Sequence, residues 1–330
     1  MSATNGAVVS VRGLAKRYGE VEAVRGIDFD VEPGETFGFL GPNGAGKSTT
    51  INMLCTLVTP SAGSATVAGY DVVASRLDVR RSIGLVFQDT TLDNYLTAGE
   101  NLRFHAELYG LPRHGLAARV DDVLEVVGLG ERRDGLVLTF SGGMKRRLEI
   151  ARGLLHAPRV LFLDEPTIGL DPQTRASIWE YLEALRTQRA MTIFLTTHYM
   201  DEAEHCDRIA IIDQGAIATI GTPVELKAGV GADRVRLSTA DDEAAIAALG
   251  ERFGIEAAMH DGEVTLHVAD GNRFVPRLFA ELGVEIESVS VSRPSLDDVF
   301  MAWTGRTIRD AEASAGDRNR AFARAFRGRR

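Results

Sequence analysis

The sequence has 330 residues, of which 45 % are apolar and 25 % are charged, and its formal net charge is −9 at pH 7. A soluble chain of this length can bury a full hydrophobic core and has room for two domains. The acidic balance argues against nucleic acid as the main partner, and no stretch approaches the roughly 18 continuous apolar residues that would span a bilayer.

The N-terminal segment and the cysteine content both bear on location. Residues 1–6 lack a charged segment followed by an apolar run, so we expect no secretory signal. Two cysteines, Cys55 and Cys206, give no disulfide framework, which fits a reducing cytosol. His205 precedes Cys206 without the spacing of a metal site, so we favour a packed or surface pair.

Residues 41–48 form the first motif. They read Gly-Pro-Asn-Gly-Ala-Gly-Lys-Ser, which fits the P-loop pattern GxxxxGK followed by Ser or Thr. An apolar, strand-like run at 35–40 precedes the loop, and a helical segment begins near Ser48. Consecutive N–H groups of such a turn form a concavity that binds anions, and the helix adds the positive end of its dipole. The sequence therefore predicts binding of a nucleoside triphosphate.

The P-loop pattern gives separate roles to its polar residues. Lys47 is expected to hold the β- and γ-phosphates, Ser48 to offer its hydroxyl to Mg²⁺, and Thr49 to contact a phosphate. The predicted ATP-binding residues of this segment are Gly41, Pro42, Asn43, Gly44, Ala45, Gly46, Lys47, Ser48 and Thr49.

Residues 91–155 read mostly helical. Near the end of this region, Ser141, Gly142 and Gly143 form a Gly-rich turn that opens a helix. The turn is therefore a second candidate for an anion site at a helix N-terminus.

A short apolar run at Val160–Leu163 predicts a buried parallel strand. Asp164 and Glu165 follow at its carboxyl end, where ligands bind in open α/β sheets. From this position Asp164 can reach Mg²⁺ through water, and Glu165 can face the γ-phosphate and an attacking water. Glu165 is therefore the candidate general base.

Further elements complete an α/β core. Strands are predicted at Thr192–Leu195 and Arg208–Ile212, and a helix at Arg175–Arg186. With the strands at 35–40 and 160–163, they predict a largely parallel sheet covered on both faces by helices.

The pattern changes after residue 225, where the predicted nucleotide-binding domain ends. Residues 226–234 read as a linker. From 235 to 304, strand and helix signals alternate as β-α-β-β-α-β, with Asp261-Gly262 as a hairpin turn, which suggests a small ferredoxin-like α+β domain. This accessory domain has no catalytic constellation, and dimer contact, regulation by a ligand and coupling to a membrane partner are all open roles.

Residues 305–330 form a basic tail. Six arginines between Arg318 and Arg330 surround Phe322 and Phe326, which are spaced i, i+4. Such a segment can lie on an anionic membrane surface. A solvated, poorly ordered tail is the favoured interpretation.

The motifs together resemble one family. The segments 41–48, 141–143, 163–166 and 169–171 occur in the order and spacing of ABC-transporter ATPases, and the resemblance covers about residues 8 to 223. It implies a P-loop NTPase core with a helical subdomain, ATP and Mg²⁺ as ligands, and ATP hydrolysis. The turn 141–143 resembles the signature loop, which would act in trans on the ATP of a second copy or of a paralogue.

The resemblance also implies roles for single residues. Tyr18 resembles the aromatic that stacks on adenine, and Gln88 the glutamine that touches Mg²⁺ and senses the γ-phosphate. Asp171 resembles the loop acid that crosses the dimer interface, and His198 the histidine that contacts the γ-phosphate. The implied catalytic residues are Glu165, His198 and Lys47, and the implied Mg²⁺ residues are Ser48, Gln88 and Asp164.

Within the family, the chain resembles exporter ATPases of the daunorubicin/doxorubicin-resistance type. The segments that carry this likeness are Thr139–Met144, Val86–Asp89 and Pro294–Phe300. Phe140 and Met144 stand where Leu and Gln are usual in the wider family, and a Met cannot donate the hydrogen bonds of an amide.

This likeness implies an ATP-hydrolysing motor subunit that drives efflux of a drug-like or other amphiphilic substrate through a separate multi-span membrane permease. Such a subunit would lie at the cytoplasmic face of the cell membrane, with residues 89–108 carrying much of the permease contact. An importer motor with a C-terminal regulatory domain is the alternative. A non-transport ABC ATPase is less favoured, because the chain has one P-loop, one signature motif and no sustained heptads.

Overall fold

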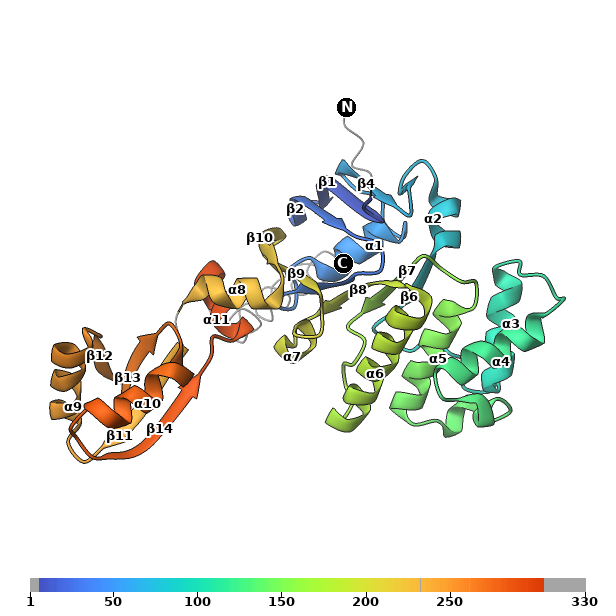
Figure 1. Cartoon of the computed structure of the whole chain (residues 1–330). Coiled ribbons are helices and arrows are strands. Elements are labelled where there is room, and N and C mark those ends of the chain that lie inside the picture. Colours follow the sequence, from blue (N-terminus) through green and yellow to red (C-terminus); the bar gives the residue numbers. More distant parts are fainter. Residues whose placement is uncertain (1–5, 232, 261, 306–330) are drawn as a thin grey trace, which may run out of the picture. The chain divides into compact units, whose positions relative to one another are not determined.

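The computed structural model describes residues 6–231, 233–260 and 262–305 (Figure 1). The chain divides into two compact units, and the division falls between Thr222 and Pro223. Most of the predicted basic tail and Asp261 of the predicted hairpin turn lie outside the described residues.

The first unit is built on a six-stranded sheet. Its strands are, in sheet order, β10 (Ala216–Gly221), β9 (Arg208–Asp213), β3 (Thr36–Leu40), β8 (Thr192–Thr197), β7 (Val160–Asp164) and β6 (Ile83–Val86). Neighbours from β9 to β6 are parallel, whereas β10 pairs with β9 in the antiparallel direction. Every residue of β3, β7 and β8 is buried, as expected for parallel strands covered on both faces. The largely parallel α/β core predicted from the sequence is confirmed.

A second, antiparallel sheet packs against the first through aromatic rings. Its strands are, in sheet order, β2 (Val21–Val31), β1 (Val9–Tyr18), β4 (Ala62–Val67) and β5 (Tyr70–Asp71). Phe29 on β2 stacks on Phe37 of β3, with ring centroids 5.5 Å apart, and lies 6.0 Å from Phe194 of β8. Replacing one such buried ring by Ala would cost about 3–5 kcal/mol.

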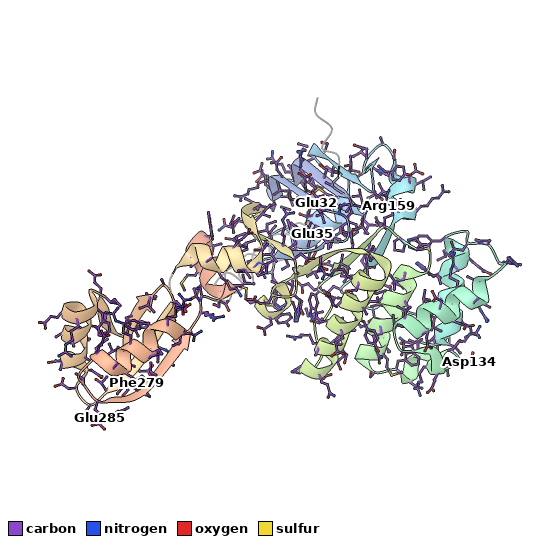
Figure 2. The ribbon with its side chains drawn as sticks, viewed as in Figure 1. Glu32, Glu35, Asp134, Arg159, Phe279 and Glu285 are labelled. Carbon is purple, nitrogen blue, oxygen red and sulfur yellow. The ribbon has the colours of Figure 1, made fainter. Side chains whose placement is uncertain are left out.

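Glu32 and Glu35 mark the turn between β2 and β3 (Figure 2). The Glu35 carboxylate accepts a hydrogen bond from the Glu32 N–H at 2.7 Å and lies 3.3 Å from a guanidinium nitrogen of Arg208 on β9. These contacts fix the turn from which β3 runs to the P-loop.

Helices cover the central sheet and form a separate helical region. They are α1 (Lys47–Leu54), α2 (Arg76–Ser82), α3 (Ala98–Leu108), α4 (Leu116–Val126), α5 (Gly142–Leu154), α6 (Pro172–Arg189) and α7 (Met200–Ala203). α3, α4 and α5 lie side by side within the predicted helical stretch 91–155 (Figure 1). A capping box starts α3: the Thr97 hydroxyl accepts the Glu100 N–H at 3.2 Å, and the Glu100 carboxylate accepts the Thr97 N–H at 2.8 Å.

The second unit contains the predicted β-α-β-β-α-β order. Its elements are β11 (Asp233–Thr239), α9 (Asp242–Ala248), β12 (Ala257–His260), β13 (Glu263–Val268), α10 (Gly271–Glu281) and β14 (Ile286–Ser292). The strands form one antiparallel sheet in the order β12-β13-β11-β14. Alternate residues Val235 and Leu237 of β11 point into a core with Leu266 of β13 and Leu278 of α10.

The predicted linker at 226–234 is wrong at both ends, because helix α8 (Pro223–Val230) covers its start and β11 begins at Asp233. Helix α8 packs against α11 (Leu296–Thr304) within the same unit. Proline is favoured at the first helical position, where its missing N–H is not needed, and Leu226 is buried. The small residues after Lys227 suggested a loop, but tertiary packing outweighs that weak local preference.

Candidate functional site

The P-loop joins the carboxyl end of β3 to the N-terminus of α1. Two of its glycines are required by close backbone approach. A Cβ at Gly41 would lie 2.2 Å from the Ile212 carbonyl oxygen, and a Cβ at Gly46, whose φ is 108°, would lie 2.6 Å from the Ala23 carbonyl oxygen. A larger residue at either position would force the neighbouring backbone to move.

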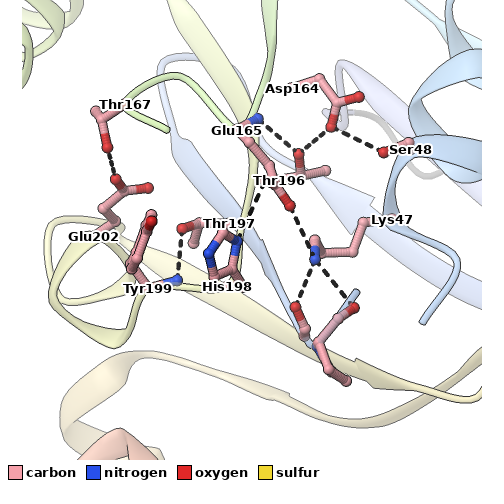
Figure 3. Close-up of polar contacts among 12 residues, drawn as sticks. Lys47, Ser48, Asp164, Glu165, Thr167, Thr196, Thr197, His198, Tyr199 and Glu202 are labelled. Carbon is pink, nitrogen blue, oxygen red and sulfur yellow. Dashed lines mark hydrogen bonds and ion pairs between the residues drawn. The ribbon is translucent and has the colours of Figure 1, made fainter. Parts of the chain in front are cut away.

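Lys47 reaches back across the P-loop (Figure 3). Its ammonium donates to the carbonyl oxygens of Gly41 at 2.6 Å and Pro42 at 3.1 Å, and lies 3.2 Å from Glu165 Oε1. The side chain is only 4 % exposed. Its positive charge is therefore held beside the turn whose N–H groups suit an anion.

The hydroxyls of Ser48 and Thr196 both donate to Asp164 Oδ1, at 3.2 and 2.5 Å (Figure 3). This contact joins the start of α1 to the ends of β7 and β8. Hydroxyl and carboxylate oxygens suit Mg²⁺, which takes few protein ligands and keeps waters and phosphate oxygens. In the part of the chain that the structure describes, no group of three or more His, Cys, Asp or Glu side chains could hold a metal. The Ser48 hydroxyl and the Asp164 carboxylate are oxygen donors that fit Mg²⁺ bound together with nucleotide phosphates.

Glu165 follows β7 in the left-handed region, with φ 48°, which non-glycine residues rarely adopt. Its backbone N–H donates to the carbonyl and hydroxyl oxygens of Thr196, at 3.2 and 3.1 Å. Its carboxylate lies 3.2 Å from Lys47 Nζ and 3.3 Å from His198 Nδ1. Burial alone would raise the pKa of Glu165, but His198 and Lys47 outweigh it and hold the pKa below its ordinary value. The carboxylate is therefore ionised at neutral pH and can accept a proton.

Thr196 is a site residue that the sequence analysis missed. Its hydroxyl contacts both the Asp164 carboxylate and the backbone of Glu165. The available signal was its position at the polar end of an otherwise apolar buried strand. Asp164 and Glu165 had the same signal at the end of the neighbouring strand.

A cavity of about 630 Å³ lies beside the P-loop, within the size range of small-molecule sites. Tyr18 lines it and is 46 % exposed, and Lys16 Nζ lies over its ring at 4.9 Å from the centroid. The cavity brings together most of the predicted ATP-binding residues. Its lining residues are Tyr18, Val21, Ala23, Pro42, Asn43, Gly44, Gly46, Lys47, Ser48, Thr49, Gln88 and Glu165.

The predicted signature residues and Asp171 lie elsewhere, at the N-termini of two neighbouring helices. Ser141 caps α5, accepting the Met144 N–H at 3.3 Å. Asp171 caps α6, accepting the Thr174 N–H at 3.0 Å. None of Ser141, Gly142, Gly143 and Asp171 is among the residues that line the P-loop cavity. One chain therefore does not bring these residues to its own P-loop.

Two family models match the chain. The model described as ABC transporter matches residues 24–168, and the model described as ATP-binding protein DrrA1-3-like, C-terminal domain, matches residues 221–304. The first range covers the P-loop, Asp164 and Glu165, and the second covers most of the accessory unit.

Two of the curated relatives align over nearly the whole chain, and a third aligns over about two thirds of it. The linearmycin resistance ATP-binding protein LnrL of Bacillus subtilis (strain 168) is 40 % identical over 312 residues, covering 92 % of this chain and 100 % of the relative. The daunorubicin/doxorubicin resistance ATP-binding protein DrrA of Streptomyces peucetius is 41 % identical over 310 residues, covering 92 % and 94 %. The Nod factor export ATP-binding protein I of Ralstonia nicotianae is 44 % identical over 220 residues, covering 66 % and 68 %.

Solved structures agree on the fold of the first unit. The protein cbiO1 from Clostridium perfringens, described as part of the ABC transporter complex cbiONQ, aligns with a TM-score of 0.64 at 29 % identity, covering 76 % of this chain and 97 % of that one. A dimeric ATP-binding cassette in a post-hydrolysis state, bound to ADP and Pi, aligns with a TM-score of 0.59 at 26 % identity, covering 65 % and 98 %.

The chain therefore belongs to the ABC transporter family, as an ATP-binding subunit. It binds nucleotide and hydrolyses ATP, and it is a motor subunit of the exporter type. The importer alternative is not favoured, because these curated relatives are resistance and export proteins. Within the described ranges, no helix is both long and apolar enough to cross a membrane.

Proposed function

We propose that this subunit lies at the cytoplasmic face of the cell membrane and uses ATP hydrolysis to drive efflux of a drug-like or other amphiphilic compound through a separate multi-span permease. The compound class is inferred from relatives whose names include linearmycin, daunorubicin and doxorubicin. The permease contact is inferred to lie around residues 89–108, which follow Gln88 and include α3.

The catalytic part of the proposal is supported by one observation: a single cavity is lined by Tyr18, Lys47, Gln88 and Glu165. In this proposal Tyr18 stacks on adenine, and Lys47 with the P-loop N–H groups holds the β- and γ-phosphates. Glu165 then orients a water and accepts its proton, while His198 contacts the γ-phosphate.

Ser48 and Asp164, with Gln88 beside them, would hold Mg²⁺, which neutralises phosphate charge when bound. Ser48 and Asp164 already share a hydrogen bond, so the two oxygens need little movement to bind a common ligand. Their positions and the buried charge of Lys47 make catalysis mainly a matter of positioning and charge neutralisation.

The site is completed in trans. Ser141, Gly142 and Gly143 would close over ATP held by the P-loop of a second copy or paralogue, and Asp171 would cross the interface. The support is that both helix N-termini lie outside the cavity of their own chain. Phosphate would then sit between two helix N-termini, which both favour negative charge.

The test is to purify the complexes that form on this chain in its native membrane and to identify the integral proteins. A multi-span partner that stimulates ATP hydrolysis is the expected result. Recovery only with ribosomes or DNA, with no membrane partner, would overturn the transport proposal but leave the nucleotide chemistry intact.

A further inference from the structure

Two oppositely charged residues are buried together on α5. Arg146 is 6 % exposed and Glu149 is fully buried, and Arg146 Nη1 lies 3.2 Å from Glu149 Oε2. Charged side chains are rarely buried unless they are paired and hydrogen-bonded, because each loses its hydration. The partners of this pair are therefore informative.

Arg146 binds the backbone of two segments that carry proposed catalytic residues. Its Nη1 donates to the Phe87 carbonyl oxygen at 2.5 Å, directly before Gln88. Its Nη2 donates to the carbonyl oxygens of Asp164 and Glu165, both at 3.2 Å.

The Nε of the same guanidinium donates to the Pro166 carbonyl oxygen at 2.6 Å. The planar fork of Arg146 thus satisfies four backbone carbonyls from two loops at once. A lysine has its donors on one nitrogen and cannot reach acceptors spread in this way.

Glu149 binds the segment that follows Gln88, and we call residues 87–91 the Gln88 loop. Its Oε1 accepts the Thr91 N–H at 2.8 Å. Arg152, one turn further along α5, donates to the Thr91 hydroxyl at 2.6 Å and to its carbonyl at 3.2 Å. Gln88 is therefore bracketed by Phe87 and Thr91, both of which are bound to α5.

The helix that carries this pair begins at the signature turn. Ser141 is its N-cap, so Arg146 and Glu149 lie one and two turns inside it. A displacement of α5 would move the Gln88 loop and the end of β7 together, because the buried pair binds both. A displacement of the Gln88 loop would likewise act on the backbone of Glu165 through Arg146.

We propose that Arg146 and Glu149 are positioning residues that fix the Gln88 loop and the Glu165 backbone relative to α5. Movement of the loop is thereby coupled to hydrolysis. The inference rests on the roles proposed for Gln88 and Glu165. Neither Arg146 nor Glu149 is among the residues that line the P-loop cavity, and Arg146 reaches Glu165 through its backbone carbonyl only, so we expect the pair to affect turnover rather than ATP affinity.

The test is steady-state ATP hydrolysis and ATP binding in the full chain with Arg146→Lys. We expect kcat to fall about tenfold or more while the KM and the Kd for ATP change by less than about threefold. Arg147→Lys is the matched control: Arg147 is adjacent on α5 but bonds Tyr181 and the Val127 carbonyl, and touches neither loop. Its kcat is expected to stay within about twofold of the wild type.

Glu149→Gln supplies an independent readout, because an amide keeps the shape and removes the charge. We expect faster amide hydrogen exchange at residues 87–91 than in the wild type, and a loss of kcat that is not additive with that of Arg146→Lys. If Arg146→Lys does not fold, exchange and kcat in Glu149→Gln decide the question.

Unchanged kcat in folded Arg146→Lys or Glu149→Gln, or losses in the two that simply add, would overturn the coupling inference. Glu165→Gln is measured in the same assay to separate the two proposals. If Glu165→Gln abolishes turnover while the positioning variants stay active, only the coupling inference fails. If Glu165→Gln turns over normally, the catalytic role proposed for Glu165 fails first.

Discussion

Lys47 Nζ and Glu165 Oε1 lie 3.2 Å apart, and both side chains are almost fully buried. One comes from the start of α1 and the other from the residue after β7, so the pair joins the phosphate-binding turn to the proposed catalytic carboxylate. The same ammonium donates to two P-loop carbonyl oxygens. The ATP phosphates would therefore compete with these carbonyl and carboxylate oxygens for the Lys47 ammonium. Binding of ATP would weaken the ion pair between Lys47 and Glu165.

Lys47→Ala should weaken ATP binding strongly. Losing a charge-assisted contact to the phosphates removes about 2–4 kcal/mol, or roughly 30- to 1000-fold in Kd. Isothermal titration with ATP measures the change. Lys227→Ala on α8 of the accessory unit is the control for loss of a lysine, and an equal loss of affinity there would remove the specific role of Lys47.

Gly41→Ala should destabilise the first unit. The added Cβ would lie 2.2 Å from the Ile212 carbonyl oxygen, and such overpacking costs about 1–3 kcal/mol, which lowers the melting temperature by several degrees. Gly229→Ala on α8 has no atom within 4 Å of the new Cβ and should leave the melting temperature equal or higher. Differential scanning calorimetry of both variants checks this, and an unaffected Gly41→Ala would contradict the packing around the P-loop.

Tyr18→Ala should weaken ATP binding by about 5- to 150-fold, because a base stacked on an aromatic ring is worth about 1–3 kcal/mol. Tyr18→Phe keeps the ring and should bind ATP nearly as well as the wild type. Titration with a fluorescent ATP analogue distinguishes the two variants. Equal affinity of Tyr18→Ala and the wild type would place adenine elsewhere.

Stability should fall on mild acidification because of His105 on α3. Its ring lies 4.7 Å from Tyr109, whose ring lies 4.4 Å from His156. Burial first, then the charges of Arg152 and His156, lower the pKa of His105 from 6.5 to about 4. The folded protein therefore binds this proton less tightly than the unfolded chain, and stability is lost as the pH falls from 6.5 to about 4.

At pH 5 the lowered pKa of His105 reduces the free energy of unfolding by about 2 kcal/mol relative to neutral pH. His105→Gln should flatten the fall in melting temperature between pH 7 and pH 5, whereas His114→Gln, at an exposed position after α3, serves as the control for loss of an imidazole. A pH profile that is identical in His105→Gln and the wild type would show that other groups cause the loss.

The sequence predicted the elements that local chemistry determines. The P-loop, the acids after Val160–Leu163 and the β-α-β-β-α-β order each have a short-range signal, and the structure has the corresponding elements at these places. Contacts between residues far apart in the chain could not be predicted from the sequence. Nothing in the basic run at 145–147 indicates that Arg146 is buried, because its burial depends on carbonyl oxygens supplied by two distant loops.

The predicted linker failed for a related reason. The small residues Ala228 and Gly229 read as a loop in the sequence, yet they belong to α8, which packs on α11 at the C-terminal end of the unit. Thr196 was missed because a hydroxyl in a strand carries no motif of its own. Its role appears only when β7 and β8 lie side by side and in register, with Asp164 opposite Thr196.

The most direct measurement of the catalytic account is ATP hydrolysis, ATP affinity and oligomeric state of Glu165→Gln beside the wild type. The amide keeps the size of the side chain but cannot take a proton from water. The account predicts that ATP affinity is retained, that turnover falls by about 100-fold or more, and that an ATP-bound dimer accumulates. Full turnover in this variant would contradict Glu165 as the general base and the site built around it.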